Sequence, residues 1–169
     1  MKTNITLIGM PGAGKSTAGI ILAKNLALGF IDTDVLIQIN HGMSLQTILD
    51  KTGYMNLRKI EEVEILKLNI ENHVIATGGS AAYSERAMAH LRDISRLVFL
   101  GVSYETCRKR IRNFEGRGIA REPVQTFKDL FDERQVLYRK YAEITVDCNS
   151  ITQEEVAEEI SRLLYNVDI

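Results

Sequence analysis

Cysteine, proline and long apolar runs are all scarce in this chain of 169 residues. The two cysteines, Cys107 and Cys148, form no C-x-x-C pair and are too few for a disulfide framework, which favours a reducing compartment. The first residues contain no apolar stretch typical of a signal peptide, and no run approaches the length of a membrane span. We therefore expect a cytoplasmic protein that does not enter a membrane, with both cysteines serving as packing residues.

An excess of charge of either sign is also absent, because 21 basic residues are matched by 22 acidic ones and the formal net charge is −1. Such a chain offers no overall field that would attract nucleic acid or an anionic membrane. The three histidines, His41, His73 and His90, are isolated and do not have the spacing of zinc ligands. Any anion that the protein binds must therefore be recognised by a few locally placed basic side chains.

The hydrophobic pattern predicts an α/β fold. Five short, nearly all-apolar runs alternate with longer helical stretches, which is typical of a parallel sheet covered by helices on both faces. The expected strands cover residues 4–8, 30–31, 74–77, 96–100 and 144–146. No internal repeat or low-complexity linker interrupts the chain. We expect residues 1–169 to form one three-layer α/β/α domain around a five-stranded parallel sheet.

Capping residues and helical periodicity predict where several helices begin and end. Ser44 is expected to cap a helix over 45–51 that stops at Gly53. Thr152 and Glu155 form a capping box before the last helix. The remaining expected boundaries are Gly29 as the end of the first helix, one continuous helix over 54–72, and a helix from Ser103 toward Phe114.

The most specific motif is the stretch GMPGAGKS at residues 9–16, which follows the first expected strand and fits the phosphate-loop pattern G-x-x-x-x-G-K-[ST] in full. In this motif a strand ends and a helix begins, so that consecutive backbone N–H groups face a phosphate chain. Lys15 is expected to contact the β- and γ-phosphate oxygens, and the Ser16 hydroxyl to bind Mg²⁺. The chain is therefore predicted to bind a nucleoside triphosphate.

Two carboxylates follow the second expected strand, at Asp32 and Asp34. Alternation along an extended segment would place both on the same side, facing one cleft at the carboxyl edge of the sheet. One is suited to hold a Mg²⁺-bound water and the other to orient an acceptor hydroxyl, or the pair is a helix cap followed by a solvated acid. The chain lacks the Asn-Lys-x-Asp and D-x-x-G motifs of GTPase switches. These features favour a kinase.

Three further signals indicate a small anionic acceptor. Arg58 is followed three residues later by Glu61, a spacing at which the acid would orient the guanidinium group. Arg134 and Arg139 flank residues 136–138, and the backbone amides of 77–79 are suited to form an anion-binding concavity after the third strand. Each signal taken singly is better explained as a surface ion pair or an ordinary turn, so only their combination indicates an acceptor site.

The order and spacing of these motifs resemble the shikimate kinase family, a phosphate-loop group similar to the nucleoside monophosphate kinases. The resemblance extends from Asn4 to about Asp147 and includes residues 9–17, 30–34, 42–44, 57–61, 75–79 and 133–139 together with Arg117. It implies a P-loop kinase fold with a mobile lid near residues 113–123. The implied reaction transfers a phosphoryl group from ATP to shikimate, giving shikimate 3-phosphate in aromatic amino-acid biosynthesis.

The resemblance also implies roles for individual residues. The catalytic residues would be Lys15, Asp34 and Arg117, the last acting from the lid on the transferring phosphoryl group. ATP would be bound by Gly12, Ala13, Gly14, Lys15, Ser16, Thr17, Arg110 and Arg117. Shikimate would be bound by Asp34, Arg58, Gly79, Ser80 and Arg134. Mg²⁺ would be held by Ser16 and, in its outer sphere, by Asp32. Because no exposed apolar stripe demands a partner, a monomer is expected.

The chain departs from the family pattern at several positions. Ser80 replaces the third glycine of a glycine triplet, and glycine follows Arg117 where the lid usually has proline, which should leave that backbone freer. The other departures are Leu49 and Leu57 in place of aromatic residues and Val136 in place of proline. Two alternatives therefore stay open: a related kinase for another small hydroxy-carboxylate such as a sugar acid, and a nucleotide-binding regulatory module without catalysis.

Overall fold

The computed structural model describes residues 2–111, 114 and 116–167 and contains one five-stranded sheet. The strands are β1 (Asn4–Ile8), β2 (Gly29–Asp32), β3 (His73–Ala76), β4 (Ser95–Gly101) and β5 (Ile144–Asp147). They pair in the order β2-β3-β1-β4-β5, and all four pairings are parallel. β1 lies in the middle and all its residues are buried, which explains why it is mostly apolar, with Asn4 and Thr6 as its polar members. The carboxyl ends of the strands meet at one edge, where open parallel sheets bind ligands.

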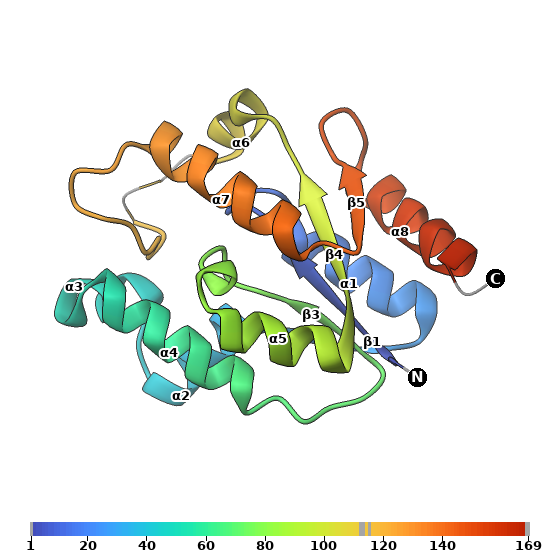
Figure 1. Ribbon diagram of the computed structural model, residues 1–169, viewed down its shortest axis with the longest axis horizontal. Helices are drawn as coiled ribbons and strands as arrows, with labels where there is room; N and C mark the ends of the chain where they lie inside the picture. The colour runs from blue at the N-terminus through green and yellow to red at the C-terminus, as the bar shows by residue number, and fades with distance from the viewer. Residues whose placement is uncertain (1, 112–113, 115, 168–169) are drawn as a thin grey trace.

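Helices cover both faces of this sheet. α1 and α8 pack together on one face, and α5 and α7 cross the other face in contact with β4 (Figure 1). α2, α3 and α4 pack on one another at the left of Figure 1. The helix bounds are α1 (Lys15–Leu26), α2 (Thr33–His41), α3 (Leu45–Thr52), α4 (Tyr54–Leu66), α5 (Glu85–Ile94), α6 (Tyr104–Arg110), α7 (Phe127–Tyr141) and α8 (Gln153–Val167), with a 3-10 turn at Ala81–Tyr83. The predicted three-layer α/β/α fold is confirmed.

The apolar side chains form two clusters. The larger one surrounds the sheet and includes Cys107 and Cys148, which are buried, unpaired thiols as expected for packing residues. The smaller one joins α2, α3 and α4 to Ala120, with Ile37, Ile48 and Leu57 as its buried members. This second cluster fixes the α2–α4 group beside the carboxyl edge of the sheet, where the site is built.

Local capping signals predicted helix ends correctly where the cap and the helix are neighbours in sequence. Ser44 caps α3 through the Thr47 N–H, and Gly53 is the residue at its C-terminal end. Thr152 and Glu155 exchange the two hydrogen bonds of a capping box at the start of α8. In both arrangements the hydrogen bonds join residues only three positions apart, so the local sequence is enough to predict them.

Other predicted helix boundaries were wrong because residues distant in sequence form hydrogen bonds with the backbone groups that the helix would have used. The helix expected over 54–72 ends at Leu66, since the Ile70 carbonyl accepts from Asn4 Nδ2 at 2.7 Å and Asn72 adopts a left-handed φ of 58°. Gly29 does not end a helix but begins β2, because α1 already stops at Leu26 with Ala27 in the left-handed region.

Several further elements differ from the sequence prediction. α6 ends at Arg110, short of Phe114, and residues 112, 113 and 115 of the expected lid lie outside the described part of the chain. Helices α2, α5 and α7 had not been predicted, although the Thr126–Asp129 capping box of α7 is readable in the sequence. In residues 2–111, 114 and 116–167, no helix is both long enough and apolar enough to cross a membrane.

Candidate active site

The phosphate loop joins β1 to α1 at the carboxyl edge of the sheet. Gly12 and Gly14 have φ angles of 81° and 96°, and Gly14 is the residue that caps α1. No side chain caps this helix end, so the first N–H groups of α1 remain available to an anion. The positive end of the helix dipole adds to their attraction for phosphate oxygens.

Lys15 is the buried cation of this loop. Its Nζ donates to the carbonyl oxygens of Gly9 at 2.7 Å and Met10 at 2.9 Å, which leaves one of its three N–H groups for a ligand. Burial lowers the pKa of Lys15 to about 8, although the carboxylate of Asp34 acts in the opposite direction. The side chain stays mostly protonated at neutral pH and supplies a poorly hydrated positive charge.

Ser16 and Asp32 lie together at the opening of the loop. The Ser16 hydroxyl donates to Asp32 Oδ2 at 2.5 Å, while Asp32 Oδ1 accepts from the backbone N–H groups of Asp34 and Val35 and caps α2. Asp32 is therefore a helix cap and a neighbour of the nucleotide loop at once. The expectation that Asp32 and Asp34 alternate along an extended segment was wrong, because Asp34 lies in the first turn of α2.

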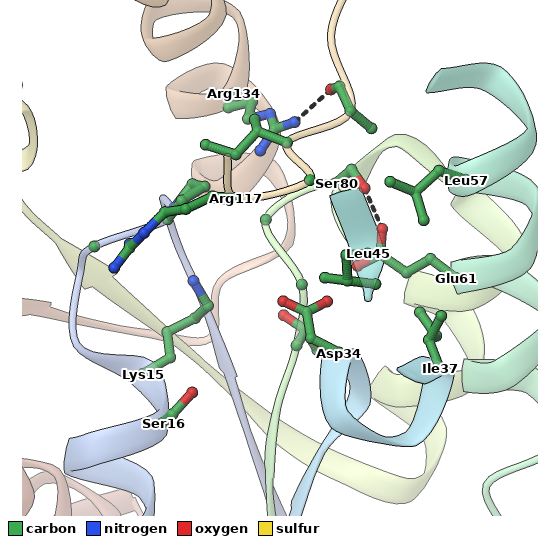
Figure 2. Close-up of a pocket in the computed structure, with 18 of the residues that line it drawn as sticks. Lys15, Ser16, Asp34, Ile37, Leu45, Leu57, Glu61, Ser80, Arg117 and Arg134 are labelled. Atoms are coloured by element: carbon green, nitrogen blue, oxygen red, sulfur yellow. Dashed lines mark hydrogen bonds between the residues drawn. The ribbon is translucent and has the colours of Figure 1, made fainter. Parts of the chain in front are cut away.

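One cavity of about 490 Å³ connects the phosphate loop to the α2–α4 group. In Figure 2, Lys15 and Ser16 lie on one side and Asp34, Glu61, Ser80 and Leu57 on the other. Its lining also includes Thr17, Arg110, Arg117 and Arg134. Of the predicted nucleotide residues, Ala13 is absent from the lining because its side chain is buried beneath the loop.

Asp34 lies deep in this cavity, at the end away from the loop opening. Burial raises its pKa to about 6, repulsion by Asp32 adds to the shift, and the positive charges of Lys15 and Arg134 reduce it. A carboxylate with this pKa is ionised at neutral pH and is basic enough to accept a proton from a polarised hydroxyl.

Arg134, from α7, is the fully buried arginine of the site, with 1% of its surface exposed. Its Nη2 donates to the Ala120 carbonyl at 2.8 Å, and its Nε has no protein partner. Tyr138, one turn further along α7, donates to the Gly79 carbonyl at 2.6 Å. α7 therefore places the unpartnered Nε of Arg134 at the cavity wall, and through Tyr138 it also anchors the turn that follows β3.

Arg58 takes a different position from the one expected. It lines a neighbouring depression of about 370 Å³, stacked 3.6 Å from the ring centre of Tyr83. Its Nη2 approaches the same Ala120 carbonyl at 3.4 Å, so the two arginines converge on one backbone oxygen. The expected pairing with Glu61 was wrong, because the Ser80 hydroxyl donates to Glu61 instead.

Ser80 carries no backbone strain at the position of the third glycine. Its φ of −94° lies outside the left-handed region that favours glycine, and its side chain is buried with Glu61. In the described part of the chain, the N–H groups of Gly79 and Ser80 donate to no protein acceptor. The replacement of glycine by serine therefore keeps both backbone donors and adds a side-chain hydrogen bond.

The described part of the expected lid packs against α3. The Gly118 N–H donates to Gln46 Oε1 at 2.8 Å, and Gly118 adopts a φ of +65°. Proline could supply neither the donor nor this angle, so glycine at this position defines a different local structure from the usual Arg-Pro-Leu. Arg117 is exposed and extends toward the phosphate-loop side of the cavity (Figure 2).

Arg110 and Gly79 both line the cavity. Arg110 donates to the Ala13 carbonyl at 3.5 Å and to the Cys148 carbonyl at 3.1 Å, which places its guanidinium between the phosphate loop and the segment after β5. Gly79 lines the cavity opposite the loop.

Sequence reasoning missed the apolar lining of the acceptor end. Ile37, Leu45 and Ile119 come from α2, α3 and segment 116–123 and line the cavity with Leu57. In the sequence these apolar residues have the pattern of ordinary core residues, so no local signal identifies them as cavity-lining residues. Leu49 packs in the smaller cluster and does not line the cavity. Val136 is 69% exposed and lies outside the cavity, so valine in place of proline does not alter the lining.

A phosphate loop at the end of a parallel strand, joined by one cavity to a half-buried carboxylate and arginines, defines a P-loop phosphotransferase. Comparison with known proteins narrows this class. The sequence profile of the family described as "Shikimate kinase" matches residues 11–165. The chain belongs to the shikimate kinase family.

Individual shikimate kinases align with this chain over almost the whole length of both proteins. The shikimate kinase of Sulfurihydrogenibium sp. is 35% identical over 158 residues, covering 93% of this chain and 95% of that protein. The one from Caldanaerobacter subterraneus is 36% identical, covering 94% of each chain. Among solved structures, the shikimate kinase from Acinetobacter baumannii in complex with shikimate superposes with a TM-score of 0.92, at 29% identity and with 100% and 96% coverage.

Proposed function

We propose that the protein transfers the γ-phosphoryl group of ATP to a hydroxyl of shikimate, giving ADP and shikimate 3-phosphate, as a cytoplasmic monomer. The observation that carries this proposal is the single cavity with Lys15 at the nucleotide side and Asp34 and Arg134 at the other. A hydroxyl bound beside Asp34 would face the end of a nucleotide bound on the loop. Catalysis would then consist mainly of positioning and charge stabilisation.

The residues at the loop opening fit Mg²⁺. Ser16 Oγ and Asp32 Oδ2 lie 2.5 Å apart, so Ser16 Oγ would be a direct ligand and Asp32 would accept from a metal-bound water. Mg²⁺ typically takes one or two protein oxygens and fills its other positions with water and phosphate. The bound ion would neutralise charge on the phosphate oxygens. Asp32 would act from the outer sphere, since it already caps α2.

The acceptor carboxylate would be bound by Arg134 and Arg58. Both guanidinium groups now reach the Ala120 carbonyl, which is the kind of partner that a carboxylate oxygen would replace. The free N–H groups of Gly79 and Ser80 would add donors for the ring hydroxyls or the carboxylate. Asp34 would accept the proton of the attacking hydroxyl.

One assay separates the proposal from its alternatives. ADP release is measured with shikimate, quinate, gluconate or no acceptor. Turnover that depends on shikimate supports the proposal. Turnover on gluconate instead would indicate a sugar-acid kinase, and tight ATP binding without acceptor-dependent turnover would indicate a regulatory module.

Arg134→Ala is expected to raise the KM for shikimate about 10- to 100-fold, because it removes a charge-assisted hydrogen bond in a buried site. Arg58→Ala should raise it less, because that side chain is more loosely attached to the site. Arg139→Ala, an exposed arginine on the same helix as Arg134, is the matched control. If the methyl ester of shikimate bound as well as the acid, neither arginine would be a carboxylate ligand.

Arg117→Ala is expected to lower kcat about 10- to 30-fold with little change in the KM for either substrate, because its charge would act on the transferring phosphoryl group. Arg121→Ala serves as the control, since Arg121 donates to the Gln125 carbonyl and stacks on Phe114 outside the cavity. Steady-state kinetics of both variants provide the test. An equal loss in both would indicate a general effect on this segment.

A further inference from the structure

The backbone that follows Arg117 is attached to α3 by a side chain that the proposed reaction does not use. The Gly118 N–H donates to Oε1 of Gln46, a half-buried residue in the first turn of α3, at 2.8 Å. Gln46 Nε2 donates in turn to Asp50 Oδ1 at 2.8 Å, one helical turn further along. The reversed amide would place its oxygen against the Asp50 carboxylate and its NH₂ group against the Gly118 N–H. These two partners therefore fix the orientation of the amide.

Gly118 itself lies directly on the first turn of α3. Its φ is +65°, and a Cβ atom added there would lie 2.5 Å from Leu45 Cβ and 2.7 Å from the Gln46 backbone nitrogen. The left-handed angle and these short distances both exclude a side chain at this position. Proline, the residue of the family pattern, would in addition lack the N–H group. The contact with Gln46 therefore depends on the glycine that departs from that pattern.

Arg117, the residue directly before this contact, reaches the phosphate-loop side of the cavity (Figure 2). Its side chain is exposed and has several rotatable bonds, so the mean position of its guanidinium group depends on how firmly the backbone beside it is held. Ala120, three residues on, is held by the smaller apolar cluster and by the Arg134 guanidinium on its carbonyl. Gln46 restrains the backbone between these two points.

We infer that Gln46 is a positioning residue for Arg117: it holds the backbone of Gly118 on α3 and so directs the Arg117 guanidinium toward the transferring phosphoryl group. The hydrogen bond supplies a restraint that proline would give through its fixed φ. Every atom of the contact belongs to the protein, so it forms before either substrate binds. Because α3 belongs to the α2–α4 group, the contact ties Arg117 to the acceptor end of the cavity. This inference rests on the proposed function and deepens it.

Amide hydrogen exchange of the free protein, followed by NMR, tests the contact without any substrate. Gln46→Met keeps a long, flexible side chain but removes the acceptor, so the Gly118 amide should exchange about fivefold faster, the loss of one hydrogen bond. Gly53, whose N–H donates to the Leu49 carbonyl at 2.8 Å at the other end of α3, is the internal reference. Its exchange rate should stay the same. An unchanged rate at Gly118, or an equal increase at Gly53, would overturn the inference.

Steady-state kinetics test the consequence for the reaction. Gln46→Met should lower kcat about 3- to 10-fold, with the KM for ATP within about twofold, because the guanidinium group is correctly placed for a smaller fraction of the time. In an Arg117→Ala background the same substitution should change kcat by less than about twofold, since no guanidinium group is left to position. Lys51→Met, at an exposed position of α3 outside the cavity, is the control and should change neither kcat nor the exchange of Gly118.

The inference and the proposed function fail separately. An equal loss of kcat on Gln46→Met in the wild-type and Arg117→Ala backgrounds would show a general effect on α3 and would overturn the inference, as would an unchanged kcat in an active enzyme. Absence of shikimate turnover by the wild type would overturn the proposed function itself. The exchange experiment would still decide whether Gln46 holds the backbone beside Arg117, because it needs no turnover.

Discussion

Lys15→Ala is expected to lower kcat by at least about a hundredfold, because it would remove the buried cation that we propose contacts the transferring phosphoryl group. Loss of one such transition-state contact typically costs about 3–4 kcal/mol. The burial of Lys15 strengthens the expectation, since a charge with few water neighbours interacts more strongly with phosphate oxygens.

The fold of this variant should survive. The substitution frees the carbonyl groups of Gly9 and Met10 but also removes a desolvated charge, and these two effects oppose each other. Lys24→Ala, an exposed lysine near the other end of α1, is the control and should retain full activity. Steady-state kinetics with circular dichroism provide the measurement. A Lys15→Ala enzyme with more than about a tenth of the wild-type kcat, a loss of only ~1.4 kcal/mol, would contradict the assigned role.

Asp34→Asn is expected to reduce kcat about 100- to 1000-fold while leaving the Kd for ATP within about twofold, because it would remove the proposed general base and leave the nucleotide loop untouched. The amide keeps the size of the side chain but can neither accept the proton nor carry the charge. Calorimetric titration with ATP separates binding from turnover. Asp93→Asn, an exposed position on α5, is the control, and an equal loss of ATP affinity in Asp34→Asn would show that Asp34 acts on the nucleotide.

The same group links activity and stability to pH in opposite directions. Burial raises the pKa of Asp34 from 3.8 to about 6, so kcat should fall as the pH decreases through about 6 and the base becomes protonated. Because the folded pKa lies above the unfolded one, the ionised carboxyl destabilises the fold, and this cost grows between about pH 4 and 6. Asp34→Asn should therefore be more stable than the wild type at pH 7, with a smaller difference at pH 4. Urea unfolding at both pH values measures this.

The nucleotide half of the site was predictable because it is local. Residues 9–16 contain the turn, the helix start, Lys15 and Ser16, so the whole motif is carried by residues that are adjacent along the chain. The strands followed from apolar runs, and the caps at Ser44 and Thr152 from hydrogen bonds that span only three residues. Where a prediction depended on distant partners, as for the helix over 54–72 that Asn4 and Thr3 cut short, it was wrong.

The acceptor half was decided by the tertiary structure. Its wall combines side chains from α2, α3, α4 and α7 with the turn after β3 and segment 116–123, which meet only when the sheet and the α2–α4 group pack together. Sequence spacing placed Glu61 within reach of Arg58 on one helix face, but the folded chain offers it the Ser80 hydroxyl instead and gives Arg58 the ring of Tyr83. By itself the sequence determined the class of fold and the nucleotide loop, because backbone conformation there is set by residues that are adjacent along the chain. Which acid meets which donor was decided only in the folded protein, because buried polar groups take the partners that close packing leaves within hydrogen-bond distance.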